Sequence, residues 1–579
     1  MDNRQNSIFK INNILISANI DDEYTSGLIA QNGKILADNK NLNKDYIKEF
    51  KKIKSGEKIK APTEAPPSEA AALAYMSQNK CALAFGEYLR LLKSEPDNIE
   101  FIKQLCSNLL VLKGYTVILD YFFDKLEPYK DTDNKVLGIL SGALYSSQEH
   151  YDDAIPFFEK MVEVYPEDSS AWFNLAFCTE RTYQDKYLDK QIEYTKKSLE
   201  YSPDDSAILA FLGRLLFRNG QTEESRECFE KMMKCKPNPE DVVVYSRFLL
   251  KTGELTKGYD MHRIRFDTGI IAYPKLLTWD KRWDGEKDLS DSTVIAHYEQ
   301  GFGDSVMFSR YLPELSKRAK KVIFVVQKNL IPLFKSSGYD KYCEILSHEA
   351  DVNPNIELEN TNRSVMYSNG KGMGMIEHDY HIPLMDLPYL MKESTDKMAQ
   401  AGGYLKSDKD KIAEFREKYI NKNNKFKIGL AYHGTKDSIL TYRDISVHKF
   451  LPLLKMDGVE FYSFQSDKYA QELQELDKSI NIVDLGKVFK DFGDTAAAMN
   501  CMDLTITTDN VIMNLGGALG LKTFVLFNKY TEARWYKTEG EDVGWYKSVK
   551  PFHAKTFNDW DNLIIEVKKE VEELLRQSD

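Results

Sequence analysis

Residues 293–304 read Thr-Val-Ile-Ala-His-Tyr-Glu-Gln-Gly-Phe-Gly-Asp, so a β-branched, apolar run leads into a glycine-rich turn, and helix-like sequence follows from Val306 to Leu315. The order strand, glycine-rich turn and helix is typical of a parallel α/β sheet, and free N–H groups at such a helix start attract negative charge. Gly301 and Gly303 can adopt positive φ and let the backbone approach a phosphate or a sugar closely. We therefore predict a ligand site here, with the carboxylate of Asp304 placed to act as a base. The alternative is a tight turn that binds nothing.

Short β-branched runs alternate with helical stretches from about Pro274 onward, which is the signature of parallel sheets. The predicted strands are Thr293–His297, Val322–Val326, one that opens at Lys427, Phe461–Gln465, Leu504–Thr507 and Thr523–Phe527. An amphipathic helix is expected from Asp559. We expect two Rossmann-like domains in tandem, residues 266–405 and 406–579, with a cleft between them.

Polar residues gather just past the strands of the second half, at 432–436, 465–467 and 508–510. Ligands of parallel sheets lie at the carboxyl ends of the strands, so these segments mark a candidate binding edge. Gly516 and Gly517 interrupt a helical stretch nearby. Because each glycine costs a helix about 1 kcal/mol relative to alanine, the pair indicates either close helix-on-sheet packing or close approach of a ligand.

An internal repeat occupies residues 65–260. Small residues at its first and third positions let two antiparallel helices approach, an aromatic residue at the fourth fills the seam, and a proline ends the second helix. The three segments that share this register are Ala72-Tyr75-Ala84-Tyr88-Pro96, Gly142-Tyr145-Ala154-Phe158-Pro166 and Gly213-Leu216-Ser225-Phe229-Pro237. Weaker copies lie at 105–128, at 172–203 with an insertion at 182–187, and at 245–266.

This pattern resembles tetratricopeptide repeats and predicts an α-solenoid over residues 63–265, whose concave face binds a peptide. The alternative is a set of repeats that only braces the rest of the chain. Residues 1–62 are predicted to form an N-terminal segment and linker, with a candidate β element at Ile8–Ala18 and Gly27–Ala37.

Composition excludes several classes of function. A net charge of −11 and a pI near 5.6 argue against nucleic acid as the main partner. No apolar run approaches the ~20 residues of a membrane helix, and no signal-peptide core follows Met1, so a cytoplasmic location is expected. The seven cysteines are scattered and never spaced Cys-x-x-Cys, which predicts free thiols. The two Asp-x-Asp sequences, Asp131–Asp133 and Asp559–Asp561, follow no predicted strand, so we predict no metal site.

Several motifs together resemble bacterial glycosyltransferases of the GT-B fold that carry an N-terminal tetratricopeptide domain. Relatives of this kind include heptosyltransferases, O-linked N-acetylglucosamine transferases and flagellin glycosyltransferases. The motifs are Arg282-Trp283-Asp284-Gly285, Glu299 to Tyr311, Ile428 to Gly434, Tyr462 to Gln465, Thr507 to Asn510, Leu515 to Gly520, and Trp545-Tyr546. The resemblance covers roughly residues 70–575 and implies an α-solenoid followed by an α/β GT-B fold.

The resemblance also implies roles for individual residues. Asp304 matches the catalytic carboxylate and is the candidate base, since glycosyl transfer to a hydroxyl requires removal of its proton. Lys436 and Arg443 are candidates to neutralise the phosphates of the leaving nucleotide, without a metal. Where relatives carry a histidine at the end of the Thr507–Asn510 motif, this chain has Asn514; His433 is a candidate to compensate. The predicted donor site comprises Gly301, Gly303, His433, Lys436, Arg443, Gln465, Thr508, Asp509, Asn510, Asn514 and Trp535, the last as a ring that stacks on the base or as a core residue.

These inferences predict a protein O-glycosyltransferase. It would move a sugar from a UDP- or CMP-linked donor, with no other cofactor, to a Ser or Thr of a polypeptide held by the repeats, with flagellin the leading acceptor by family likeness. The alternative is a catalytically inactive, repeat-containing scaffold with a vestigial GT-B domain, which Asn514 motivates.

Overall fold

The structure is a computed structural model, and most of its described residues lie between 130 and 578. The described residues are 68–77, 87–88, 91, 95, 98, 100–105, 126, 130–147, 149–268, 281–299, 301–348, 366–368, 373–375, 377–392, 403–434, 443–529, 531, 533–535 and 544–578. The chain divides into two compact units, one up to Lys236 and one from Pro237. The candidate β element and the linker predicted before residue 62 lie outside the described residues.

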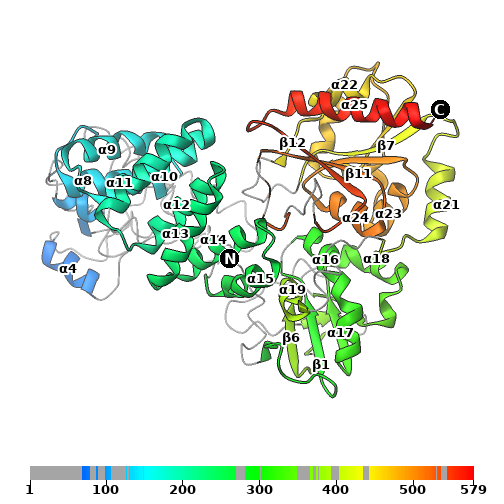
Figure 1. The fold of residues 1–579 in the computed structure, drawn as a ribbon, viewed down its shortest axis with the longest axis horizontal. Helices are drawn as coiled ribbons and strands as arrows, with labels where there is room; N and C mark the ends of the chain where they lie inside the picture. Colours follow the sequence, from blue (N-terminus) through cyan, green and yellow to red (C-terminus); the bar gives the residue numbers. More distant parts are fainter. Residues whose placement is uncertain are drawn as a thin grey trace, which may run out of the picture. The chain divides into compact units, whose positions relative to one another are not determined.

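The first unit is helical, and its best described part consists of antiparallel pairs (Figure 1). The pairs are α8 (Lys135–Ser147) with α9 (Tyr151–Val164), α10 (Ser169–Tyr183) with α11 (Leu188–Tyr201), and α12 (Ser206–Arg218) with α13 (Thr222–Lys234). The helix α4 (Glu69–Ser77) precedes them. A 3-10 turn, η2 (Gln184–Tyr187), joins α10 to α11 where the sequence predicts an insertion.

The predicted repeat register is confirmed in the two pairs that the structure describes in full. A Cβ atom on Gly142 of α8 would lie 2.8 Å from the ring of Phe158 in α9, and one on Gly213 of α12 would lie 3.0 Å from the ring of Phe229 in α13. Real side chains do not approach so closely, so only glycine lets the aromatic ring of the second helix seat against the first. Most of the copy at 105–128 lies outside the described residues.

The second unit begins with one more helical pair, α14 (Pro239–Lys251) and α15 (Leu255–His262), followed by η3 (Arg263–Thr268). These elements correspond to the weak repeat copy at 245–266. The boundary between the two units lies ahead of this pair, between Lys236 and Pro237. The domain boundary at 265/266 stays a prediction.

The first sheet has six strands in the order β5-β4-β3-β2-β1-β6. They are β1 (Thr293–His297), β2 (Lys321–Val325), β3 (Glu344–His348), β4 (Met366–Ser368), β5 (Met373–Met375) and β6 (Tyr380–Pro383). The strands β1, β2, β3 and β6 are parallel, and β4 and β5 add an antiparallel edge on the side of β3. The connecting helices include α16 (Phe302–Phe308), α17 (Leu312–Arg318), α18 (Ile331–Ser336) and α19 (Leu387–Leu390), with η9 (Leu384–Asp386) directly after β6.

The second sheet has six parallel strands in the order β12-β11-β10-β7-β8-β9. They are β7 (Phe426–Ala431), β8 (Val459–Ser463), β9 (Ile482–Asp484), β10 (Leu504–Thr508), β11 (Thr523–Phe527) and β12 (Val549–His553). The helical elements are α21 (Lys409–Lys418), α22 (Leu451–Leu454), η12 (Lys468–Glu475), α23 (Phe492–Met499), α24 (Val511–Leu519) and α25 (Trp560–Ser578). Because the first and fourth strands, β7 and β10, are neighbours, this is the doubly wound order, in which the chain reverses direction across the sheet between those two strands.

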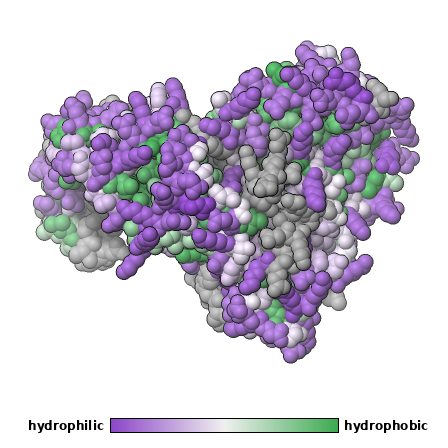
Figure 2. Space-filling model, in the orientation of Figure 1, coloured by the Kyte–Doolittle hydropathy of each residue, from purple (hydrophilic) through white to green (hydrophobic). Residues whose placement is uncertain are grey.

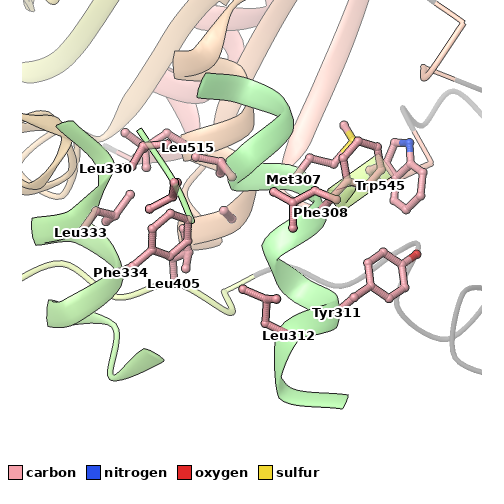
Figure 3. Packing of buried hydrophobic residues seen from close by; sticks show 14 of the residues in the cluster. Met307, Phe308, Tyr311, Leu312, Leu330, Leu333, Phe334, Leu405, Leu515 and Trp545 are labelled. Atoms are coloured by element: carbon pink, nitrogen blue, oxygen red, sulfur yellow. The ribbon is translucent and has the colours of Figure 1, made fainter. Parts of the chain in front are cut away.

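A large apolar cluster joins helices of the first sheet to helices and loops of the second. Figure 3 shows Met307 and Phe308 of α16 beside Trp545, and Phe334 of α18 beside Leu405. All six predicted strands of the two halves are present, and so is the helix after Asp559. The structure therefore consists of a tetratricopeptide-like helical region followed by a region of parallel sheets.

The glycine pair in α24 serves packing. A Cβ on Gly516 would lie 2.2 Å from Oγ1 of Thr523, and one on Gly517 would lie 2.2 Å from the ring of Tyr546. Close packing on the sheet, rather than approach of a ligand, explains both glycines. No helix in the described part of the chain is both long and apolar enough to cross a membrane.

Candidate functional site

Side-chain amides join the carboxyl ends of β8 and β10 to that of β7 in the second sheet. Oε1 of Gln465, just past β8, accepts hydrogen bonds from the backbone N–H groups of Tyr432 (3.2 Å) and His433 (3.1 Å), just past β7. Nδ2 of Asn510, just past β10, donates to the carbonyl oxygen of His433 at 3.3 Å. The structure thus brings three of the predicted site residues together, and two of them hold the strand ends in register.

His433 is held from two sides. Its Nε2 lies 2.8 Å from Oε1 of Glu472, and its ring stacks on Tyr469 with centroids 3.9 Å apart and planes 7° apart. Burial opposes a charge on the ring, but the nearby carboxylates of Asp444 and Glu472 outweigh it and raise the pKa of His433 above its ordinary value. Glu472, Asp444 and Tyr469 were missed by sequence analysis, because nothing in their spacing ties them to β7.

The segment after β10 starts helix α24. Oδ1 of Asn510 accepts a hydrogen bond from the backbone N–H of Ile512 at 2.9 Å, so Asn510 caps the helix. Thr508 is fully buried, and its Oγ1 accepts a bond from Asn510 Nδ2 at 3.3 Å. Asp509 lies beside Arg443, with Oδ2 and Nη1 3.6 Å apart. A helix N-terminus and a guanidinium group meet here, which is the chemistry that binds a phosphate.

The glycine-rich turn after β1 differs from the prediction. Gly301 caps α16 with φ −68° and ψ 170°, and neither Gly301 nor Gly303 has a positive φ among the described residues. Neither glycine therefore uses the positive φ that glycine permits. The close approach that Gly303 permits is to Asn514 of α24, because a Cβ on Gly303 would lie 2.7 Å from Nδ2 of that residue.

Asn514 hydrogen-bonds within the second half and packs against Gly303 of the first. It is buried, its Nδ2 donates to the carbonyl oxygen of Asn510 at 3.4 Å, and its Oδ1 accepts from the hydroxyl of Tyr546 at 3.1 Å. An asparagine side chain satisfies both partners while leaving room for Gly303. The asparagine at this position is thus accommodated by local hydrogen bonds.

Asp304 lies in the first turn of α16 and is almost fully buried. Its Oδ1 is paired with Nη1 of Arg534, from the segment after β11. Burial lowers the pKa of Arg534, and the positive charge of Arg247 on α14 lowers it further. Sequence analysis missed Arg534, because the residue lies far from Asp304 in the chain and in a segment without a motif.

One other predicted residue does not join this arrangement. Trp535 is 3% exposed and packs against Phe527 and Tyr546, with centroids 6.2 and 6.4 Å away. Its ring is part of the core and presents no open face for a base, so the core alternative fits. Lys436 lies outside the described residues.

At the corresponding edge of the first sheet lies a buried network of ion pairs. Nε and Nη2 of Arg265, in η3, each donate to Glu299 at 2.8 Å, and Nη1 donates to Oδ1 of Asp386 at 2.9 Å. Nη2 of Arg282 donates to Oδ2 of Asp386 at 2.6 Å. Burial opposes the charge of Asp386, but Arg265 and Arg282 lead the cations that outweigh it and lower its pKa. Arg282 and Glu299 belong to the motifs singled out in the sequence, and here their role is structural.

The described cysteines, Cys178, Cys228, Cys235, Cys343 and Cys501, are free thiols, as predicted. Within the described ranges, no three His, Cys, Asp or Glu side chains gather as metal ligands would.

Comparison with known proteins identifies part of the chain. The tetratricopeptide repeat family matches residues 206–239, which comprise α12, α13 and the first residue of α14. Protein FlbA of Caulobacter vibrioides is 24% identical over 393 residues, which are 64% of this chain and 62% of FlbA. The chain thus matches less than two thirds of that relative's length.

Solved structures of MamA resemble the chain over a shorter stretch. MamA of Desulfovibrio magneticus is 20% identical, with 29% of this chain and 92% of MamA covered and a TM-score of 0.26. A second MamA crystal structure is 16% identical, with 28% and 94% covered and a TM-score of 0.26. The family match identifies residues 206–239 as a tetratricopeptide repeat.

Proposed function

We propose that this protein is an O-glycosyltransferase with two Rossmann-like domains in a GT-B arrangement. It transfers a sugar from a UDP- or CMP-linked donor to a Ser or Thr hydroxyl of a polypeptide bound by the repeats. The sequence resemblance supports flagellin as the first acceptor to test. Tetratricopeptide repeats stack into extended surfaces suited to binding another protein, which supports a polypeptide rather than a small molecule as acceptor.

One observation carries the proposal: the starts of two helices from different sheets pack against each other. Gly303, in the first turn of α16, lies against Asn514 of α24, so Asp304 and the capped N-terminus of α24 belong to one region. A carboxylate able to accept a proton and a helix start able to hold a phosphate are the two chemical parts that glycosyl transfer from a nucleotide donor needs.

Each of these residues has its own role in the proposed transfer. Asp304 removes the proton of the acceptor hydroxyl as the oxygen attacks the sugar carbon, and the sugar–phosphate bond breaks. The N–H groups of α24 and the guanidinium of Arg443 stabilise the charge that develops on the departing phosphate. Arg534 holds Oδ1 of Asp304, whereas no donor of the described residues contacts Oδ2, which is the oxygen left to take the proton.

Donor binding is the first test. Calorimetry with UDP- and CMP-sugars should show binding to the full chain, and Arg443→Ala should weaken it by about 10-fold or more, the value of a charge-assisted contact. Lys522→Ala is the matched control, since it removes an exposed cation at the amino end of β11, away from the carboxyl edge of the sheet. Absence of binding by every nucleotide sugar would remove the enzymatic proposal.

Transfer itself tests Asp304. Asp304→Asn keeps the shape and removes the base, so transfer to a Ser/Thr polypeptide should fall by about 10²- to 10⁴-fold with donor affinity nearly unchanged. Asp410→Asn removes a carboxylate from the first turn of α21 and serves as control. Near-normal turnover in Asp304→Asn would move the base elsewhere.

A second candidate function is a scaffold that binds partners without transfer. It is favoured by the internal satisfaction of the site: Arg534 neutralises Asp304, Glu472 holds His433, and Asn510 caps its own helix. A chain that binds its acceptor but no nucleotide sugar would fit this function alone.

A further inference from the structure

The first helices of two neighbouring repeats carry a cluster of arginine side chains around one carboxylate. Nη1 of Arg214 and Nη1 of Arg218, both on α12, lie 3.0 and 2.5 Å from Oε1 of Glu180 on α10. Nε of Arg181 lies 3.8 Å from Oε2 of the same glutamate. Burial opposes the charge of Glu180, but Arg214, Arg218 and Arg181 outweigh it and lower its pKa. Three cations thus meet one anion, and positive charge is in surplus.

The surplus charge faces solvent. The side chains of Arg181 and Arg214 are 47% and 35% exposed, whereas that of Glu180 is 10% exposed. Arg218 is largely buried and neutralises most of Glu180 at short range. The two exposed guanidinium groups are therefore the ones available to an incoming anion.

Aromatic rings hold these two guanidinium groups in place. Cζ of Arg181 lies 5.1 Å from the ring centroid of Phe177, and Cζ of Arg214 lies 4.8 Å from that of Phe211. Phe173 packs edge-on against Phe211 at 5.4 Å, and Phe173 and Phe177 are both partly exposed. The surface thus alternates positive charge with apolar rings. On the face drawn in Figure 2, hydrophobic residues (green) are scattered among hydrophilic ones (purple).

The rest of the unit has the opposite charge. On the second helix α9, four acidic residues stand against one lysine, and on α13 four acidic residues stand against three basic ones. The whole chain carries −11. A long polyanion such as a nucleic acid carries a charge about every 1.7 Å and would meet this acidic surface along most of its length. A peptide presents only a few carboxylates locally.

We propose that the arginine–aromatic face, formed by Arg181, Arg214, Phe173 and Phe177, binds an acidic segment of a partner polypeptide, with carboxylates on the arginines and one apolar side chain on the rings. This inference specifies the chemistry of the polypeptide acceptor. It rests on the proposed function, in which the repeats bind that acceptor. A peptide-binding assay without a sugar donor distinguishes the two proposals, because a failure of peptide binding would not bear on sugar transfer.

The test is fluorescence anisotropy of the full chain with a short fluorescein-labelled peptide rich in Asp and carrying one Phe. The same peptide with Asn for every Asp should bind at least about 10-fold more weakly, and salt should weaken binding of the acidic peptide. Arg181→Gln and Arg214→Gln should each reduce affinity by about 3- to 10-fold. Lys196→Gln, which removes an exposed cation from α11, should leave affinity unchanged.

Arg181→Gln is the decisive variant, because Arg181 is exposed and touches Glu180 only at 3.8 Å, so its loss leaves the buried Arg218–Glu180 pair intact. Circular dichroism checks that Arg214→Gln folds. Equal affinity for the Asp and Asn peptides, wild-type affinity in Arg181→Gln, or equal binding of a single-stranded oligonucleotide would each overturn the proposal.

Discussion

The two sheets present different chemistry at the same topological position. In the first sheet, the neighbouring ends of β1 and β6 are occupied by Arg265, which bridges Glu299 and Asp386. In the second, the neighbouring ends of β7 and β10 are joined by the neutral side chain of Asn510. Charge fills the first edge, whereas the second combines amide and hydroxyl groups with the Arg443–Asp509 and His433–Glu472 pairs.

In a parallel sheet, ligands bind where the chain reverses direction across the sheet. The difference between the two edges shows that such a point can bind a ligand only if the protein's own side chains leave it unoccupied. The segment η3, which follows the last helical pair, inserts its own cation into the first edge and completes the charge balance there. At the second edge the helix start of α24 and Arg443 still provide positive potential. We therefore expect an anionic ligand to bind at the second sheet and not at the first.

The largest effect that would separate the two edges comes from Asp386→Ala. It leaves Arg265 and Arg282 buried beside too little negative charge, so the free energy of unfolding should fall by about 3 to 5 kcal/mol, the cost of breaking a buried ion pair. Denaturant unfolding of the full chain measures this fall. Glu314→Gln, which breaks an exposed pair with Lys317, should change the same quantity by less than about 0.5 kcal/mol. Equal effects of the two substitutions would show that the first edge is not built on these charges.

Sequence patterns predicted the parts of this comparison that depend on local order. Alternating β-branched runs located β1, β2, β7, β8, β10 and β11, and the small-residue register located the helix pairs. The strands β3, β4, β5, β6, β9 and β12 were missed. Four of them carry only three or four residues, and β3 and β12 mix polar residues into their apolar runs.

The pairs that decide the chemistry of each edge could not be predicted, because their members are far apart in the chain. Arg265 meets Asp386, and Asp304 meets Arg534, only through the tertiary fold. A glycine is equally ambiguous from sequence alone. Gly303 permits a close approach, as predicted, but to Asn514 rather than to a ligand.

Gly303 of α16 packs against Asn514 of α24, and this contact lies between the two edges. In Gly303→Ala the new methyl group would lie 2.7 Å from Nδ2 of Asn514, which Tyr546 and Asn510 hold in place. We expect a loss of about 1 to 3 kcal/mol of unfolding free energy, typical of overpacking. Gly301→Ala is the matched control, since its Cβ meets only Oδ2 of Asp304 at 3.9 Å, and it should be nearly neutral. If adding Asn514→Ala to Gly303→Ala restores no stability, the clash is not with Asn514.

The smallest effect concerns His433 at the second edge. Its imidazole ring is charged only when it is protonated. Its pKa lies above the ordinary 6.5 because the nearby carboxylates of Asp444 and Glu472 outweigh burial. A raised folded-state pKa means that folding takes up a proton. The resulting stability is complete below the unfolded pKa and is lost as pH rises through the folded one, and for a partly exposed pair it should amount to less than about 1 kcal/mol.

Glu472→Gln isolates this contribution, because it removes the carboxylate 2.8 Å from Nε2 and keeps a hydrogen-bonding side chain there. The ring signals of His433, followed by NMR across neutral pH, should titrate at lower pH in Glu472→Gln than in the wild type, and the loss of stability above neutral pH should become shallower. Glu475→Gln changes a neighbouring glutamate that contacts His448 instead, and should leave the titration of His433 where it was. An unchanged titration in Glu472→Gln would mean that Asp444 alone holds the proton, and the second edge would then carry its charge on the loop after β7 rather than on η12.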